Sequence, residues 1–311
     1  MKDMRPLAIA LMGPTASGKT ALAIEWAQRL QTQIISVDSA LVYRGMDIGS
    51  AKPNAAERQG IAHHLIDIRE PWQTYSAADF VKDALPLMSQ ISQQNKIPLL
   101  VGGTGLYFRA LLDGLSDMPA ADEGIRAEIQ ARAKVQGWPA MHEVLKKVDA
   151  AAGERIKPND VQRITRALEV FKLTDKPITE WQNNSTRKKF PYRVLRVCIA
   201  PLDRSVLHER IASRFDSMLA QGFLKEMQSL MSNPLLNSDM PSMRAVGYRQ
   251  AWRHLAGESS AQQVCEEAVA ATRQLAKRQL TWFRGELDLR WFDPQLDRMK
   301  LESALALFIT R

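Results

Sequence analysis

The residues best suited to chemistry lie near the N-terminus, in the run Gly13-Pro14-Thr15-Ala16-Ser17-Gly18-Lys19-Thr20. This run fits the pattern G-x-x-x-x-G-K-[ST], which cradles phosphates through backbone N–H groups and one lysine. The glycines let the backbone wrap a polyphosphate, and a following helix would point its positive end at it. Lys19 adds a charge, and the Thr20 hydroxyl is suited to bind Mg²⁺. We therefore expect residues 13–20 to bind ATP or another diphosphate compound, with Mg²⁺ as the cofactor.

A carboxylate and a hydroxyl follow two later apolar runs. Residues 33–37 end at Asp38, and residues 97–101 lead into Gly102-Gly103-Thr104. Most NTPases with such a loop place a Mg²⁺-binding acid after a later strand, where this chain has glycines and Thr104. That difference disfavours a motor ATPase or a GTPase. The residues alone leave Asp38 open as a general base, a Mg²⁺ ligand or a helix N-cap, and Thr104 as a substrate ligand or an N-cap.

The elements that would position these residues alternate between strand and helix. Buried strands are predicted at 7–12, 33–37 and 97–101, because each is a short apolar run, with helices at 21–30 and 76–94 between them. Such alternation predicts an α/β fold with a parallel sheet and flanking helices, similar to P-loop NTPases. All three polar loops would then lie at one edge of the sheet.

The pattern changes in the middle of the chain. Between residues 121 and 182 the apolar spacing is helical throughout, and an apolar run at 194–199 then indicates a further strand. We predict a core of residues 1–121 and 186–311, interrupted by a helical insertion domain at 122–185. The polar residues 183–189 would form a hinge back into the core. Long helical stretches are expected at 204–230 and 261–284, and a final edge strand at 289–292.

Composition restricts the class of protein. Hydrophobic residues make up 45% of the 311 and charged residues 24%, which excludes a disordered, collagen-like or small disulfide-rich protein. The two cysteines cannot form a zinc finger, and a reducing, cytoplasmic location without membrane contact fits best. Forty-two basic against 34 acidic residues give a net charge of +8. A basic surface favours nucleic acids or diphosphates as partners, although a merely solvated surface is an equal alternative.

Three basic segments are candidates for binding RNA. Residues 271–284 contain no acid but carry Arg273, Lys277, Arg278 and Arg284. Arg163 and Arg166 share one helix face, which we expect to be free for phosphates. Residues 244–249 combine two arginines with a glycine and Tyr248, a set suited to splayed bases. The alternatives are a solvated helix face for the cations and core packing for Tyr248.

Several motifs together resemble the bacterial tRNA dimethylallyltransferase family. They cover nearly the whole chain: GPTASGKT (13–20), ISVDSALVY (35–43), RGMDIGSAKP (44–53), LLVGGTGLY (99–107), NDVQRITRALEV (159–170), SMRAVGYRQ (242–250) and ATRQLAKRQLTWFR (271–284). Ser50, where many members have threonine, is a mild departure. Eukaryotic members carry an appended zinc finger, and this sequence has no cysteine pair that could form one.

The resemblance implies transfer of a dimethylallyl group from dimethylallyl diphosphate to N6 of adenine 37, beside the anticodon, in tRNAs that read codons beginning with U. It implies that residues 13–20 and Arg214, with Arg210 as the substitute one turn away, hold the prenyl diphosphate. Asp38 would be the general base and Thr104 would contact the substrate nucleotide, both as catalytic residues. The partners implied are the tRNA anticodon stem-loop and dimethylallyl diphosphate, bound by a monomer.

The resemblance also implies a larger set of residues that contact tRNA: Asp38, Ser39, Ala40, Leu41, Thr104, Arg126, Gln162, Arg163, Ile164, Thr165, Arg166, Arg244, Ala245, Val246, Gly247, Tyr248, Arg249, Arg273, Lys277 and Arg278. Two other functions stay open on the residues alone. One is an ATP-dependent kinase of small molecules or nucleosides, and the other is a non-catalytic RNA-binding protein with a nucleotide-binding fold.

Overall fold

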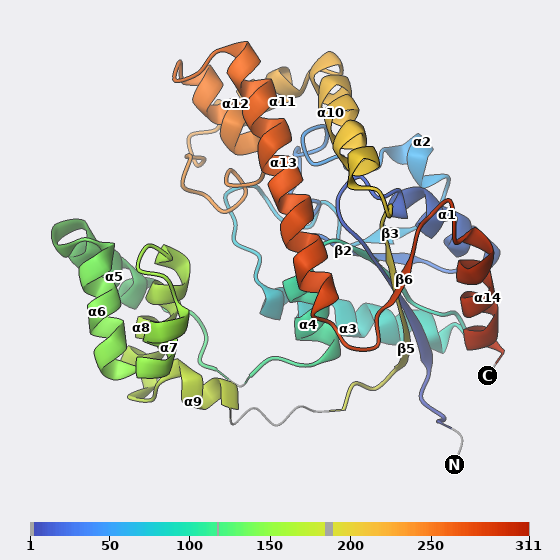
Figure 1. Cartoon of the computed structure of the whole chain (residues 1–311), viewed down its shortest axis with the longest axis horizontal. Helices are drawn as coiled ribbons and strands as arrows, with labels where there is room; N and C mark the ends of the chain where they lie inside the picture. Colours follow the sequence, from blue (N-terminus) through green and yellow to red (C-terminus); the bar gives the residue numbers. More distant parts are fainter. Residues whose placement is uncertain (1–2, 117, 184–188, 311) are drawn as a thin grey trace. The chain divides into compact units, whose positions relative to one another are not determined.

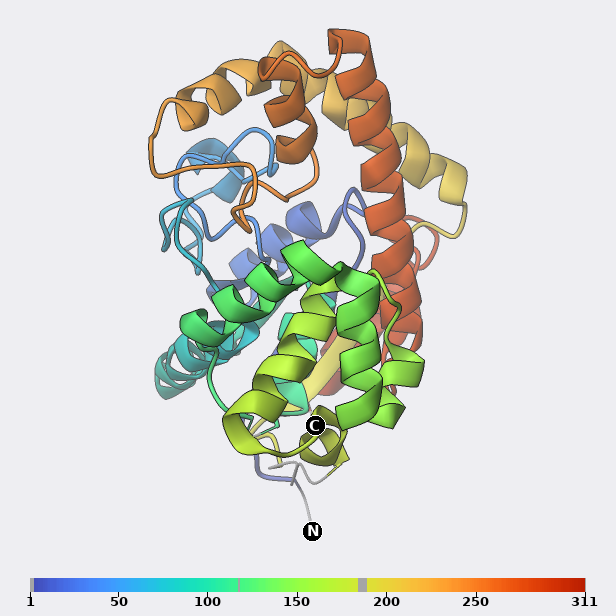
Figure 2. The same cartoon turned by 90° about the vertical axis from the view of Figure 1, so that its left-hand side faces the viewer.

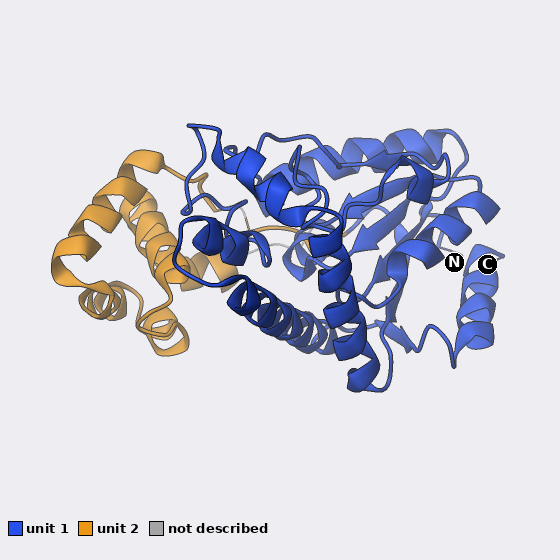
Figure 3. Ribbon diagram, turned by 90° about the horizontal axis from the view of Figure 1, so that it is seen from above, with its two compact units in different colours: residues 1–112, 190–311 blue, residues 113–189 orange. Residues whose placement is uncertain are grey.

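A computed structural model describes residues 3–116, 118–183 and 189–310. The chain divides into two compact units, one made of residues 1–112 and 190–311 and the other of residues 113–189 (Figure 3). Among the described residues, no helix is both long and apolar enough to span a membrane.

The first unit is built on a parallel sheet, as predicted. Within the described residues its strands run in the order β3-β2-β4-β1-β5-β6 (Figure 1). Their bounds are Leu7–Met12 (β1), Ile34–Val37 (β2), His63–His64 (β3), Leu99–Gly102 (β4), Arg193–Ile199 (β5) and Arg290–Phe292 (β6). Every pairing is parallel, and β4 lies between β1 and β2. The loops after β1, β2 and β4 therefore emerge side by side at one sheet edge.

Helices cover both faces of this sheet, because successive side chains of a strand point to opposite sides. Ile9 and Leu11 of β1 pack with α1 (Lys19–Arg29) and α14 (Arg298–Ile309). Ala8 and Ala10 face α3 (Ala77–Gln93) and α4 (Gly105–Leu112). Ser76 caps α3 as expected, since its side chain accepts a hydrogen bond from the Asp79 amide. This two-sided packing fixes the sheet edge that carries the polar loops.

The remaining helices of the first unit include one correction. The predicted single stretch at 204–230 is two helices, α10 (Arg204–Ala220) and α11 (Phe223–Met231), separated at Gly222. Gly222 has a φ of 97°, a left-handed conformation that suits glycine and ends α10. The long helix α13 (Ala261–Arg284) and the edge strand β6 are confirmed. The short α2 (Ala55–Arg58), β3, α12 (Tyr248–Leu255) and α14 were not anticipated.

The second unit contains helices and no strand among its described residues (Figure 2). It has its own hydrophobic core. It contains α5 (Glu123–Gln136), α6 (Trp138–Val148), α7 (Ala150–Arg155), α8 (Val161–Thr174) and α9 (Ile178–Asn183). The predicted insertion, 122–185, falls inside this unit. The unit also includes residues 113–121, since Met118 packs on its core and the Pro119 carbonyl accepts a hydrogen bond from Arg166. Most of the predicted hinge, 184–188, lies outside the described residues.

Candidate active site

The phosphate loop joins β1 to α1 as the motif requires. Gly18 is the residue before α1 and has a φ of 90°, which favours glycine. A Cβ on Gly13 would lie 2.4 Å from the Ile199 carbonyl oxygen of β5, so a glycine is also needed there for close approach. Lys19 Nζ donates to the Pro14 carbonyl at 3.1 Å. The loop is thus ready to turn its amides and Lys19 toward an anion.

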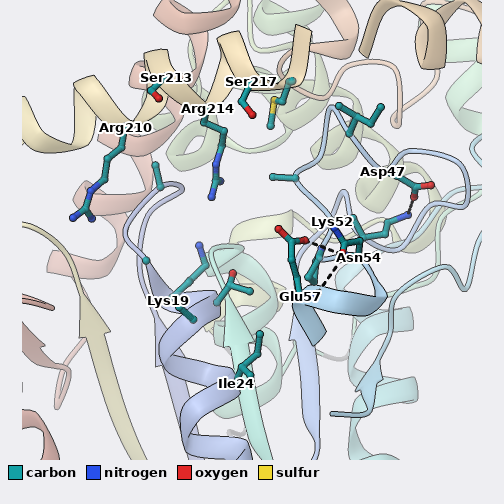
Figure 4. A pocket seen from close by; sticks show the side chains of 18 of the residues that line it. Lys19, Ile24, Asp47, Lys52, Asn54, Glu57, Arg210, Ser213, Arg214 and Ser217 are labelled. Atoms are coloured by element: carbon teal, nitrogen blue, oxygen red, sulfur yellow. Dashed lines mark hydrogen bonds and ion pairs between the residues drawn. The ribbon is translucent and has the colours of Figure 1, made fainter. Parts of the chain in front are cut away.

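Lys19 has a second cation and a carboxylate for neighbours. Figure 4 shows the Arg214 side chain reaching from α10 toward the end of Lys19. Burial lowers the pKa of Lys19 to about 8, while the Asp38 carboxylate favours and the Arg214 guanidinium opposes its charged form. The two cations would gain most from an anion placed between them, because it would relieve their mutual repulsion.

Asp38 lies directly after β2, at the carboxyl edge of the sheet where α/β proteins bind ligands. Its Oδ1 accepts from the Ala40 amide at 2.8 Å and from the Leu41 amide at 3.4 Å. Among the described residues, no hydrogen bond reaches Oδ2. One oxygen therefore fixes the turn, and the other remains available to accept a proton or bind a cation.

Thr104 links the ends of β2 and β4. Its hydroxyl accepts from the Ser39 amide at 3.1 Å, and its own amide donates to the Val37 carbonyl at 3.2 Å. A Cβ on Gly102 would lie 2.0 Å from that carbonyl oxygen, so only glycine permits this approach. The hydroxyl therefore holds the turn after Asp38 and does not cap α4.

Gln279 of α13 is a site residue that sequence reasoning missed. Its Oε1 accepts from the Thr15 amide at 2.9 Å, and its Nε2 donates to the Gly103 carbonyl at 3.0 Å. It thereby joins the phosphate loop to the loop after β4. A stripe at helical spacing, Thr272, Leu275, Gln279 and Trp282, faces the same cavity and is the signal that could have identified it.

Two cavities of the first unit meet at the phosphate loop. The Asp38 cavity has a volume of about 540 Å³ and is lined by Asp38, Thr104 and the α13 stripe. The Arg210 cavity has a volume of about 1320 Å³ and lies between α1 and α10, with Arg210 and Ser213 in its wall (Figure 4). Both cavities are lined by Lys19, Thr20, Ala51, Pro53, Arg214 and Met218. A molecule held at Lys19 and Arg214 could therefore be reached from both cavities.

The oxygen donors at this junction fit magnesium bound mainly through a substrate. The described residues contain no group of three His, Cys, Asp or Glu side chains that could hold a metal ion. Thr20 lines both cavities, and Asp38 lines one of them. Because Mg²⁺ keeps several waters and binds through phosphates with one or two protein oxygens, this donor set suits it.

The RNA-contact residues predicted in the first unit differ in exposure and in which cavity they line. Ser39, Ala40, Leu41 and Arg278 line the Asp38 cavity, as do residues 244–248. Arg249, Arg273 and Lys277 are exposed but line neither cavity. Tyr248 requires a correction, because its ring is 0% exposed and its hydroxyl donates to Glu226 at 2.6 Å. It is a core residue and cannot stack on a base.

The predicted contacts in the second unit also need correction. Ile164 is 0% exposed within the helical core, and the Thr165 hydroxyl donates to the Val161 carbonyl of its own helix. Arg166 is not free for phosphates, since it donates to the buried Glu169 carboxylate at 2.7 Å and to the Pro119 carbonyl. Arg126 donates to the same carboxylate at 2.8 Å. Helix packing therefore takes up side chains that the sequence suggested for RNA.

Glu169 is held in its charged form by these contacts. Burial alone would raise its pKa, but hydrogen bonds from Arg166, Arg126 and the Asp122 amide lower the pKa below its ordinary value. Gln162 and Arg163 remain exposed, and Arg163 pairs with Asp160 at 3.2 Å. Of the predicted pair on α8, Arg163 is thus the one that presents its charge to solvent.

Comparisons with known proteins agree with this architecture. A family model described as IPP transferase matches residues 41–286. The chain is 57% identical to a tRNA dimethylallyltransferase of Stenotrophomonas maltophilia, covering 99% of both chains. It is 57% identical to one of Xanthomonas campestris, covering 99% of this chain and 95% of the relative.

Solved structures are similar as well. A tRNA isopentenylpyrophosphate transferase of Bacillus halodurans superposes with a TM-score of 0.71 at 37% identity, covering 97% of this chain and 95% of the other. A eukaryotic dimethylallyltransferase acting on tRNA gives a TM-score of 0.81 at 25% identity, covering 97% of this chain and 78% of the other.

Proposed function

The chain belongs to the IPP transferase family and is a tRNA dimethylallyltransferase, and we propose that it prenylates N6 of adenine 37 beside the anticodon. The donor is dimethylallyl diphosphate, and the acceptors are tRNAs that read codons beginning with U. The observation that carries this proposal is the meeting of two cavities at Lys19 and Arg214, with Asp38 in the wall of one of them. One substrate can approach from each side.

The phosphate loop stabilises the leaving group. Transfer breaks the bond between the allylic carbon and the diphosphate oxygen, and negative charge builds up on that oxygen. Backbone amides at the N-terminus of α1, Lys19 and Arg214 are the groups that can receive this charge. When bound, Mg²⁺ would be held by the Thr20 hydroxyl and the diphosphate, and would neutralise part of the same charge.

Asp38 accepts the proton that N6 must lose. The adenine amino group is a weak nucleophile because its lone pair is delocalised into the ring, so proton removal must accompany formation of the new carbon–nitrogen bond. The Oδ2 atom has no partner among the described residues and can take this proton. Thr104 holds the turn that orients Asp38, through its bond to the Ser39 amide.

RNA reaches this site through cationic residues of the two units. We propose that Arg244 and Arg278 at the Asp38 cavity, exposed Arg273 and Lys277 on α13, and Arg163 on α8 contact the anticodon stem-loop. Adenine 37 must leave its stack to reach Asp38, which a flexible anticodon loop permits at low cost. Because residues of one chain form both cavities, we propose that a monomer acts, in the cytoplasm where tRNA is found.

One assay tests the activity against its rivals. The protein is incubated with unmodified tRNA, labelled dimethylallyl diphosphate and Mg²⁺, and in parallel with γ-labelled ATP and nucleosides. We expect label from the prenyl donor in the tRNA and none transferred from ATP. Phosphate transfer from ATP would support a kinase instead, and RNA binding with neither transfer would support a non-catalytic protein.

A further inference from the structure

We propose that Glu226 of α11 is a positioning residue of the transfer reaction, because its carboxylate fixes the wall that separates the two cavities. The wall is residues 47–53, called the partition segment below. This inference rests on the proposed function only for its kinetic consequences. The contacts between Glu226 and the partition segment, called the clamp below, can be tested without any assay of activity.

The partition segment faces both cavities. Asp47 and Ile48 line the Arg210 cavity, whereas Gly49 and Ser50 line the Asp38 cavity. Ala51 and Pro53 line both. The position of this segment therefore sets where the two cavities meet, beside Lys19 and Arg214. A shift of the segment would change the distance between a bound diphosphate and Asp38.

Glu226 binds three successive amides of this segment. Its Oε2 accepts from the Asp47 amide at 3.0 Å and from the Ile48 amide at 2.7 Å, and its Oε1 accepts from the Gly49 amide at 3.2 Å. Consecutive amides of this kind form a concave site for an anion, and here a side chain of the protein fills it. Tyr248 completes the set by donating to Oε1 at 2.6 Å.

A buried lysine near the other end of the partition segment ties it to the rest of the chain. The Lys52 side chain is 3% exposed, and its ammonium lies 2.6 Å from Asp47 Oδ1 and 2.5 Å from Asp67 Oδ1. It also donates to the Tyr43 carbonyl at 2.6 Å. Glu226 therefore holds the first three residues of the segment. Lys52 ties its other end to Asp67 and to the Tyr43 carbonyl, both outside the segment.

Gly49 brings the segment directly onto aromatic rings. A Cβ at this position would lie 2.1 Å from the Phe223 ring and 2.7 Å from the Tyr248 ring. These two rings pack edge to face with centroids 5.2 Å apart and are buried. Because the buried rings cannot move aside to make room for a methyl group, Gly49→Ala would displace the partition segment while leaving Glu226 unchanged.

Hydrogen exchange and kinetics test the clamp together. In the wild-type protein without ligand, the amides of residues 47–49 should exchange far more slowly than an exposed loop. Glu226→Gln replaces an acceptor oxygen by a donor, so it should speed this exchange at least tenfold. The same variant should lower kcat for prenyl transfer at least tenfold, with the Kd of inorganic diphosphate and of tRNA within threefold of wild type.

Two further variants separate positioning from general damage. Gly49→Ala should reproduce both effects of Glu226→Gln by an independent route. Lys225→Gln, on the exposed side of the same helix, is the matched control and should match wild type in every measurement.

Each failure has a distinct meaning. Rapid exchange of residues 47–49 in the wild type would overturn the clamp, even if Glu226→Gln did not fold. Faster exchange in the variant with unchanged kcat would show that the partition segment does not position the reaction. A wild-type protein that transferred no prenyl group would instead overturn the proposed function and leave the exchange result standing.

Discussion

The two carboxylate oxygens of Asp38 have different roles. Oδ1 binds the Ala40 and Leu41 amides, and Oδ2 has no partner among the described residues. Asp38→Asn keeps the shape but cannot take a proton, and a positioned base is worth about 10²–10⁴ in rate. We expect kcat to fall at least about a hundredfold, with the affinities for tRNA and diphosphate within several-fold of wild type.

Single-turnover kinetics and binding assays check this outcome. Loss of Mg²⁺-dependent diphosphate binding with intact single-turnover chemistry would make Asp38 a metal ligand instead. Glu154→Gln, an exposed change in the second unit, serves as the control that should leave both unchanged.

Titration of Lys19 should make kcat/KM fall at alkaline pH. Burial lowers its pKa to about 8, so the charge that attracts diphosphate is lost as the pH rises through that value. Because kcat/KM reports the free enzyme, kcat/KM for dimethylallyl diphosphate should fall above about pH 8. A bound diphosphate raises the pKa of Lys19, so kcat should fall only at higher pH.

The variant Lys19→Arg provides the control for this profile. Arginine stays charged throughout the range, so any activity that it retains should lack the fall near pH 8. An unchanged fall in Lys19→Arg would assign it to another group.

For single residues, the sequence predicted which residues belong to the site better than it predicted the partners that each side chain contacts. The phosphate loop, Asp38 and Thr104 could be found because their spacing is set by chemistry local to the chain. Tyr248 and Arg166 were misjudged because their partners, Glu226 and Glu169, could be known only from packing. Gln279 was missed because its two hydrogen bonds join loops more than 170 residues away in sequence.

Helix α8 shows why two arginines three residues apart should behave differently. Arg163 is exposed, so Arg163→Ala should weaken tRNA binding by about 1 kcal/mol, flatten its salt dependence and leave thermal stability unchanged. Arg166→Ala removes a partner from the buried Glu169 carboxylate and should lower the melting temperature as well. Thermal melts and tRNA titrations at several salt concentrations measure both. Equal melting temperatures for the two variants would contradict this distinction.

Element boundaries depend on signals of unequal strength. The strands other than β3 were predictable from their apolar runs and α13 from its apolar periodicity, and α3 from its Ser76 cap. The break between α10 and α11 was missed because one glycine within a helical pattern is ordinarily tolerated. Only the left-handed φ of Gly222 reveals that the chain turns there, and this turn places Glu226 at the partition segment.

The molecule as a whole consists of two units with separate cores. Among the residues that the structure describes, the hydrophobic clusters of the first unit include none from the second, and the helical cluster includes none from the first. Replacing residues 124–182 by a short linker should therefore leave a folded core that binds diphosphate. We expect its tRNA affinity to fall at least tenfold, measured by titration. Unchanged tRNA affinity would remove the helical unit from RNA recognition.

Mapping of the reaction product shows directly whether the prenyl group is transferred to one atom of one base. Two anticodon stem-loops that differ only in A37 or G37 are incubated with the wild-type protein and labelled dimethylallyl diphosphate, then digested to nucleosides. We predict N6-dimethylallyladenosine from the A37 stem-loop and no label in the G37 stem-loop. Label at another base, or equal label in both, would contradict it.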